Sequence, residues 1–109
     1  MKTDKAFIAH KTNGINLTFP NGNSLSTIWG ASSYSENHDR YMEDENLKNF
    51  DYKTRSKWGS NTVEAMPGCS TTVYELLKAK FPDEENGSVF GYMTLEKWLE
   101  MVNILNTHE

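Results

Sequence analysis

The chain has 109 residues, which suits one domain with one modest core, and its 12% aromatic content argues against wholesale disorder. Its formal net charge of −4 at pH 7 weakens any proposal of direct nucleic-acid binding, because phosphate contacts need a basic surface. Cys69 is the lone cysteine, so an internal disulfide is excluded. The sequence shows neither an apolar signal segment nor an apolar run long enough to cross a membrane. A cytoplasmic location is therefore expected.

The first predicted element is a β-hairpin over residues 14–30. Apolar and polar residues alternate from Ile15 to Phe19, which is the period of a strand with one buried face. The dipeptide Asn21-Gly22 readily adopts the positive φ angles of a type I′ turn. The pattern therefore predicts that the chain reverses at this dipeptide and returns as a second strand.

Two segments lack such a pattern. Residues 1–12 are a candidate flexible segment, and residues 31–59 are expected to form a long irregular or partly helical insertion within the single domain. Loops of that length in compact domains are often functional. A third strand is predicted over residues 60–66, followed by a break at Pro67-Gly68.

The first predicted helix covers residues 71–81. Thr72 and Glu75 have the spacing of a capping box, in which the hydroxyl and the carboxylate each accept from a backbone N–H. Apolar residues then recur at helical spacing, and Pro82 ends the helix. The residues of this apolar face are Val73, Leu76, Leu77 and Phe81.

A short strand over residues 88–92 precedes the second predicted helix, which covers residues 94–106 and is capped by Thr94. Its expected apolar stripe consists of Leu95, Trp98, Leu99, Val102 and Leu105. The order of elements predicts an α+β domain: a small antiparallel sheet led by the hairpin, with two helices packed on one face.

The densest polar cluster follows the hairpin. No metal-ligand spacing accompanies it, so we predict no metal site. More acidic residues gather beyond it, and another acidic run occupies residues 83–85. These charges are interpreted either as a solvated surface or as a face that docks on a basic partner protein with tyrosines as anchors. In the second case the partner-binding residues are Tyr34, Asn37, His38, Tyr41, Glu43, Asp44 and Glu45.

A small basic run precedes Trp58. Together with Lys53, Arg55 and Lys57, this tryptophan forms a candidate patch for a nucleotide, held by stacking and charge. The other tryptophans, Trp29 and Trp98, lie on apolar faces and are expected in the core.

Cys69 is the candidate nucleophile of an alternative, enzymatic hypothesis. It lies just before a predicted helix, whose N-terminus would lower the pKa of a thiol, and the available histidine partners are His10, His38 and His108. The enzymatic hypothesis uses Cys69 or His38. No family-specific cysteine signature surrounds it. We therefore predict a protein that is not an enzyme, with no catalytic residue and no cofactor.

Three short patterns resemble small uncharacterised proteins encoded by tailed bacteriophages: a Phe-x-Asn-Gly turn at residues 19–22, a strand ending at Gly30, and a Tyr-Ser-x-Asn loop at residues 34–37. The resemblance implies a viral source and brings no catalytic or binding residues. It favours an accessory protein that binds a host protein and inhibits or modulates it by surface occlusion, a defence-system component being one such target. The alternatives are a protein that sequesters a nucleotide signal and a small enzyme.

Overall fold

The hairpin predicted from alternation is present in the computed structural model, in which β2 (Gly14–Thr18) pairs with β3 (Ser24–Ile28) and Leu17 lies opposite Leu25. Both side chains are buried on the same face. The structure describes residues 6–9, 13–30, 32–39 and 58–109.

The turn of this hairpin differs from the predicted type I′ geometry. That type needs positive φ at both central residues, but Gly22 has a φ of 96° and Asn21 is not among the residues with positive φ. Phe19 N–H donates to the Asn23 carbonyl at 2.8 Å, and Gly22 N–H donates to the Phe19 carbonyl at 2.9 Å. The connection is a three-residue loop ending in a left-handed glycine, which fits the negative φ that Pro20 imposes.

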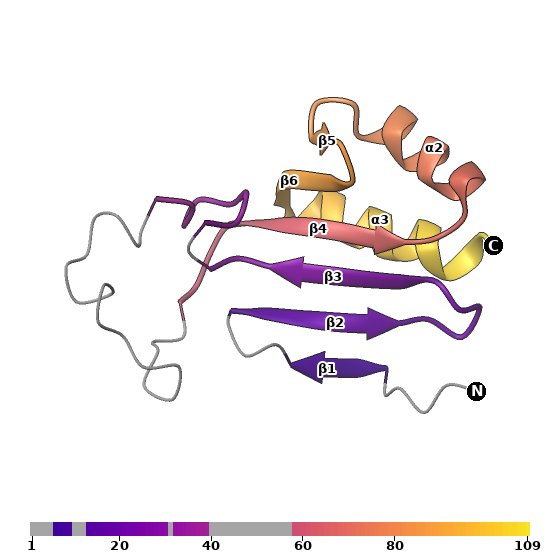
Figure 1. Ribbon diagram of the computed structural model, residues 1–109, viewed down its shortest axis with the longest axis horizontal. Helices are drawn as coiled ribbons and strands as arrows, with labels where there is room; N and C mark the ends of the chain where they lie inside the picture. The colour runs from indigo at the N-terminus through magenta and orange to yellow at the C-terminus, as the bar shows by residue number, and fades with distance from the viewer. Residues whose placement is uncertain (1–5, 10–12, 31, 40–57) are drawn as a thin grey trace.

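Around the hairpin, the strands form a six-stranded antiparallel sheet in the order β1-β2-β3-β4-β6-β5 (Figure 1). The additional strands are β1 (Phe7–Ala9), β4 (Thr62–Gly68), β5 (Glu85–Asn86) and β6 (Val89–Thr94). Strand β1 lies in the segment for which no structure was predicted.

Strand β4 does not break at its proline. Pro67 lies opposite Leu25 and remains in the strand, so the predicted break was wrong. The reason is that β6 pairs with β4 only as far as Ala65. Beyond that point β4 has a neighbour on one side only, where a missing N–H is tolerated.

Helix α2 (Thr71–Lys80) begins earlier than its predicted cap. Ser70 is the N-cap residue, with extended φ and ψ, and its hydroxyl accepts from Val73 N–H at 3.2 Å. Thr72 lies inside the helix and was the wrong cap. The cap of α3 (Leu95–Thr107) is confirmed, since the Thr94 side chain accepts from Lys97 N–H.

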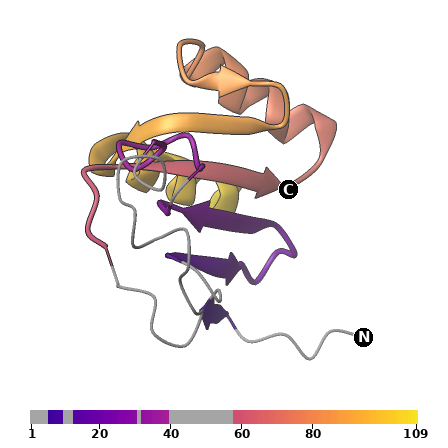
Figure 2. The ribbon, with the colours of Figure 1, turned by 60° about the vertical axis from the view of Figure 1, so that its left-hand side comes forward.

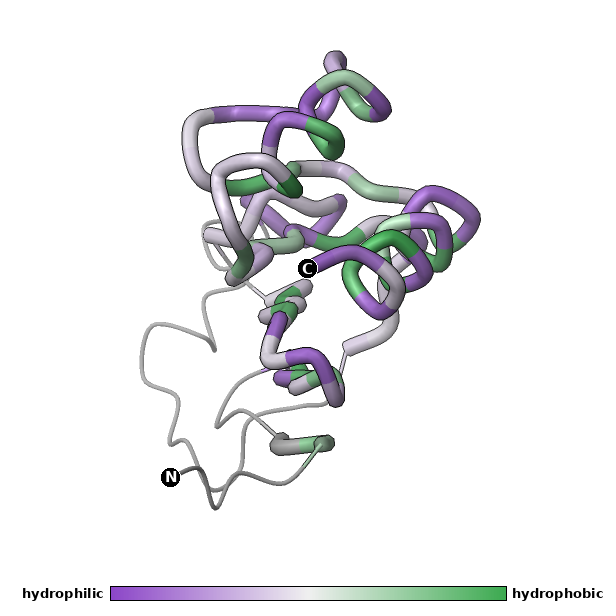
Figure 3. Tube along the Cα trace, turned by 90° about the vertical axis from the view of Figure 1, so that its right-hand side faces the viewer, coloured by the Kyte–Doolittle hydropathy of each residue, from purple (hydrophilic) through white to green (hydrophobic). Residues whose placement is uncertain are grey.

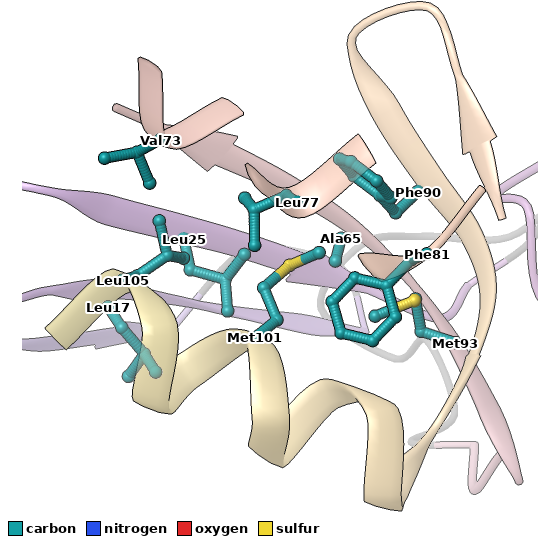
Figure 4. Packing of buried hydrophobic residues seen from close by; sticks show 10 residues of the cluster. All are labelled: Leu17, Leu25, Ala65, Val73, Leu77, Phe81, Phe90, Met93, Met101 and Leu105. Atoms are coloured by element: carbon teal, nitrogen blue, oxygen red, sulfur yellow. The ribbon is translucent and has the colours of Figure 1, made fainter. Parts of the chain in front are cut away.

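Both helices contribute to one core, which confirms the predicted α+β class. Helix α3 lies behind β3 and β4 in Figure 1, while α2 lies near the β6 and β5 end of the sheet, as the turned view of Figure 2 also shows. Figure 4 shows side chains from the helices and strands converging between these layers. The buried apolar residues are Leu17, Leu25, Ala65, Val73, Leu77, Phe81, Phe90, Met93, Met101 and Leu105.

The apolar stripe of α3 is rotated relative to the prediction. Met101 and Leu105 are fully buried, whereas Leu95 and Leu99 are 67% and 52% exposed. On α2, Leu76 is likewise exposed. Hydrophobic and hydrophilic residues alternate along both helices in Figure 3, as expected where only part of a helix surface meets a sheet. Within the described residues, no helix is long and apolar enough to cross a membrane.

The hairpin turn also caps the end of α3. Asn21 and Asn23 donate from their side-chain amides to the Leu105 carbonyl at 2.9 and 2.8 Å, and Asn23 also donates to the His108 carbonyl at 2.6 Å. Terminal carbonyls of a helix have no partner within the helix. The turn therefore joins the N-terminal hairpin to the C-terminal end of α3.

Candidate functional site

Residues 32–39 form an irregular segment beside the ends of β4 and β6 (Figure 1). Glu64 precedes the buried Ala65, so strand alternation directs its side chain to the face away from the core. Its Oε1 accepts from Tyr34 N–H at 2.8 Å, and the Tyr34 carbonyl accepts from Tyr92 N–H at 2.8 Å. The segment is thus hydrogen-bonded to two neighbouring strands on the outer face of the sheet.

The base of this segment is held by Asn37. The residue is 5% exposed, and its Nδ2 donates to the carbonyls of Trp29 at 2.7 Å and Gly59 at 3.1 Å. The hydroxyls of Ser33 and Ser35 are also buried and lie 2.8 Å apart. The Asn37 side chain is therefore used inside the chain and is not presented to a partner, unlike the role predicted for it.

Glu36 makes a reciprocal connection to the start of β4. Its N–H donates to the Thr62 hydroxyl at 2.9 Å, and its carboxylate accepts from Asn61 N–H at 2.8 Å. Because these bonds fix the backbone of the segment, its exposed side chains are pre-organised for binding.

Two tyrosines are presented by this arrangement. Tyr34 is 38% exposed and Tyr92 is 51% exposed, although their main chains are directly hydrogen-bonded. The His38 ring stacks on Tyr34 with ring centroids 5.7 Å apart and planes 13° apart. His38 Nδ1 lies 2.8 Å from the Ser33 carbonyl, an acceptor only, so Nδ1 carries the proton and donates. This bond fixes the His38 ring, against which the Tyr34 ring stacks.

Backbone strain coincides with the same place. Among the described residues other than glycine, only Ser32 and Tyr92 have positive φ, at 69° and 53°. This conformation costs an L-residue about 1–2 kcal/mol. The pairing of β4 with β6 is also irregular between Val63 and Ala65, next to Tyr92. Strain of this kind often accumulates where a binding surface requires a particular side-chain position.

A hollow of about 450 Å³ separates these rings from the loop after α2. Gly91 allows the close approach, because a Cβ added there would lie 2.8 Å from the Tyr34 Cβ. Three carboxylates line the opposite side of the hollow. We call this surface the tyrosine–carboxylate face, and it consists of Tyr34, His38, Asp83, Glu84, Glu85 and Tyr92.

The carboxylates differ in their surroundings. Glu84 Oε2 lies 2.5 Å from Lys97 Nζ, and this hydrogen bond raises the pKa of Lys97. Glu85 accepts from the Tyr74 hydroxyl at 3.0 Å. Asp83 is exposed at the edge of the hollow. The carboxylates of Glu84 and Glu85 are therefore held in position by hydrogen bonds, whereas that of Asp83 faces solvent.

The sequence pattern put Tyr34 and His38 in one polar cluster, but it did not connect them with residues 83–85 or Tyr92. The acidic run was visible as a charge pattern, whereas its position beside Tyr34 depends on the fold. The remaining predicted residues of the partner-binding set and the basic patch lie outside the described residues: Tyr41, Glu43, Asp44, Glu45, Lys53, Arg55 and Lys57. The nucleotide hypothesis accordingly stays a prediction.

Trp58 is the described member of the basic patch. It is half-buried, its N–H donates to Asn13 Oδ1 at 2.9 Å, and its carbonyl accepts from Trp29 Nε1 at 2.8 Å. Its main chain therefore ties residues 58–60 to the hairpin. Trp29 and Trp98 are only partly buried, and Trp98 packs against the core cluster.

Cys69 is half-buried and packs against the core, and this burial raises the pKa of its thiol. The direction is opposite to the one expected from the helix N-terminus, and it disfavours the reactive thiolate. No group of three or more potential ligands that could hold a metal ion is found in the described part of the chain. No known protein family, curated protein or solved structure matches this chain.

Proposed function

We propose that this protein binds a basic surface of another protein through the tyrosine–carboxylate face and inhibits or modulates that partner by covering the surface. The observation that carries this proposal is the display of Tyr34 and Tyr92, both exposed, on mutually hydrogen-bonded backbone beside the carboxylates of residues 83–85. Tyrosine is enriched among the residues that dominate binding energy at protein interfaces.

The two kinds of group would have different tasks. A tyrosine buries a large apolar ring while its hydroxyl finds a hydrogen-bond partner, so the rings would supply most of the affinity. Because the segment that carries Tyr34 is already ordered by its bonds to Glu64 and Thr62, little further entropy would be lost on binding. The carboxylates would steer and orient a basic partner.

The resemblance to bacteriophage proteins supports a host protein as the partner. A host defence component that acts on nucleic acid is our first candidate, because such proteins carry the basic surfaces that an acidic face complements. The encounter would take place in the host cytoplasm.

The test is a pull-down from host lysate with the immobilised chain, followed by a direct affinity measurement on the retained protein. Retention is expected at about 50 mM salt and weaker retention at about 500 mM salt, because ionic screening weakens contacts between exposed charges. If no protein is retained at either salt concentration, the proposal fails.

Tyr92→Gly is the most informative variant. Removal of the ring should weaken partner binding by about tenfold or more, as expected for an aromatic anchor. Glycine accepts the positive φ of this position, so relief of strain worth about 1 kcal/mol should offset the lost ring contacts and leave stability nearly unchanged. Equal binding by Tyr92→Gly and the unmodified chain would contradict the anchor role.

A charge-matched pair tests the carboxylates. Asp83→Lys should lower the association rate about tenfold at low salt, whereas Glu96→Lys, an equal charge change at an exposed position in the first turn of α3, should change it by less than about twofold. Similar effects of the two variants would mean that only net charge matters.

A further inference from the structure

A second hollow lies on the core side of the sheet, next to the first turn of α3. It encloses about 400 Å³ and is lined by apolar groups from four strand or helix elements. We call it the indole cleft, after Trp29 and Trp98, which form part of its wall. Its other apolar lining residues are Ile15, Val63, Met93 and Leu95. Small-molecule sites commonly have this size and a mainly apolar lining.

Both indole rings in the wall are fixed by their own hydrogen bonds. Trp29 Nε1 donates to the Trp58 carbonyl at 2.8 Å, and Trp98 Nε1 donates to the Thr27 hydroxyl at 2.8 Å. Each ring has therefore used its only donor within the chain. What the two tryptophans offer to the cleft is apolar and π surface in a fixed position.

Among the residues that the structure describes, the lining carries no ionisable side chain. Its polar members are Thr27, Ser60 and Asn61, and the first two have hydroxyls already engaged, with Trp98 and with the Thr62 carbonyl. A charged ligand would lose its water in this cleft without gaining a partner of opposite charge from these described residues. A neutral ligand would bury apolar surface without that cost.

The first residue of α3 completes the cleft. Leu95 is 67% exposed, the second most exposed of the large hydrophobic side chains in the described residues, yet it lines the cleft beside Trp98. A bound ring would cover this side chain. From the neutral lining, the fixed indoles and the exposed leucine together, we propose that the indole cleft binds a neutral aromatic small molecule of one or two fused rings.

This site is separate from the tyrosine–carboxylate face. Residues of the cleft lie on the core side of the sheet, whereas Glu64 and the segment bonded to it lie on the other side. The inference therefore does not depend on the proposed partner, and Tyr92→Gly should not alter binding in the cleft.

The test uses 5-fluoroindole as a neutral probe, titrated against the full chain and followed by fluorine NMR. Binding with a Kd on the order of 0.1 mM is expected for a ligand of this size in an apolar site. Indole-3-acetate and tryptamine, which add a negative and a positive charge to the same ring system, should each bind about tenfold more weakly. Absence of 5-fluoroindole binding at about 1 mM, or equal binding of all three compounds, would overturn the proposal.

Two leucines of α3 provide a matched pair of variants. Leu95→Glu places a carboxylate at the edge of the cleft, in the first helical turn where it favours the helix, and should weaken 5-fluoroindole binding about tenfold. Leu99→Glu makes the same change at an exposed position outside the cleft and should alter binding by less than about twofold. Leu95→Gln removes the apolar wall without a charge and should weaken binding about threefold or more. If Leu95→Glu and Leu99→Glu bind the probe equally, the ring does not occupy this cleft.

Discussion

The two faces of the sheet are stabilised by different interactions. On the core face, apolar side chains from strands and both helices pack together, and residues such as Phe90 and Leu77 are fully buried. On the outer face, the segment 32–39 is held by hydrogen bonds of Asn37, Glu36 and Glu64 to or from main-chain groups. The comparison teaches that this domain uses burial for its stability and hydrogen bonds for the exact placement of an exposed surface.

The largest effect is expected on the core face. Phe90→Ala should lower the free energy of unfolding by about 3–5 kcal/mol, because it leaves a cavity where Phe90 meets Phe81 and Tyr74. Urea unfolding followed by circular dichroism measures the change. Leu99→Ala is the control at an exposed position and should cost less than about 1 kcal/mol.

A smaller loss is expected on the outer face. Asn37→Ala removes the donor to the carbonyls of Trp29 and Gly59 and should cost about 1–3 kcal/mol in the same assay. In the double variant with Phe90→Ala, the two losses in the free energy of unfolding should be additive to within about 0.5 kcal/mol, since the two residues belong to separate networks. A cost for Asn37→Ala as large as that for Phe90→Ala would remove the distinction between the faces.

The N-cap of α2 provides a finer test. Ser70→Ala should cost about 1 kcal/mol, because the hydroxyl of Ser70 accepts from Val73 N–H. Thr72→Ala, at the position that the sequence favoured, should change the free energy of unfolding by less than about 0.5 kcal/mol. The opposite ranking in urea unfolding would show that the helix begins at Thr72.

A final effect concerns pH. The Tyr74 hydroxyl donates to Glu85 and to the Gly87 carbonyl, and joins α2 to the β5–β6 hairpin. Burial, followed by the hydrogen bond to Glu85, raises the pKa of Tyr74 to about 12.

An unfolded tyrosine ionises near pH 10, so the folded chain binds this proton more tightly. The resulting stability is complete below about pH 10 and is lost as the pH rises toward about 12. Tyr74→Phe should flatten the decline in the urea midpoint over this range. An unchanged decline in the variant would assign the effect to other groups.

Elements with a local period were predictable. Alternation identified β2 and β3, and the spacing of Val73 and Leu77 identified α2. The cap at Thr94 could also be predicted from the sequence, because its hydroxyl accepts from the main chain of Lys97, only three residues away. The error at Ser70 has a similar origin: Ser70, Thr71 and Thr72 are three consecutive hydroxyl residues, and only the packing of the helix selects one of them as the cap.

The candidate site could be predicted only in part, because its contacts are long-range. Tyr34 and Glu64 are 30 residues apart, and no local pattern pairs the main chain of one with the carboxylate of the other. Tyr92 appeared as an ordinary strand residue, since its positive φ arises from the irregular pairing of β4 with β6. The rotation of α3 has the same cause: the sequence offers apolar residues on more than one side of the helix, and contact with the sheet decides that Met101 and Leu105 are buried while Leu99 remains exposed.

The short strands at the two borders of the sheet have a consequence for behaviour at high concentration. β1 has three residues and β5 has two, and these are the outermost strands of the described sheet. Each border therefore offers few main-chain groups to a second molecule, and a long intermolecular ladder cannot form from them. Short borders of this kind limit self-association of the sheet when the protein is concentrated.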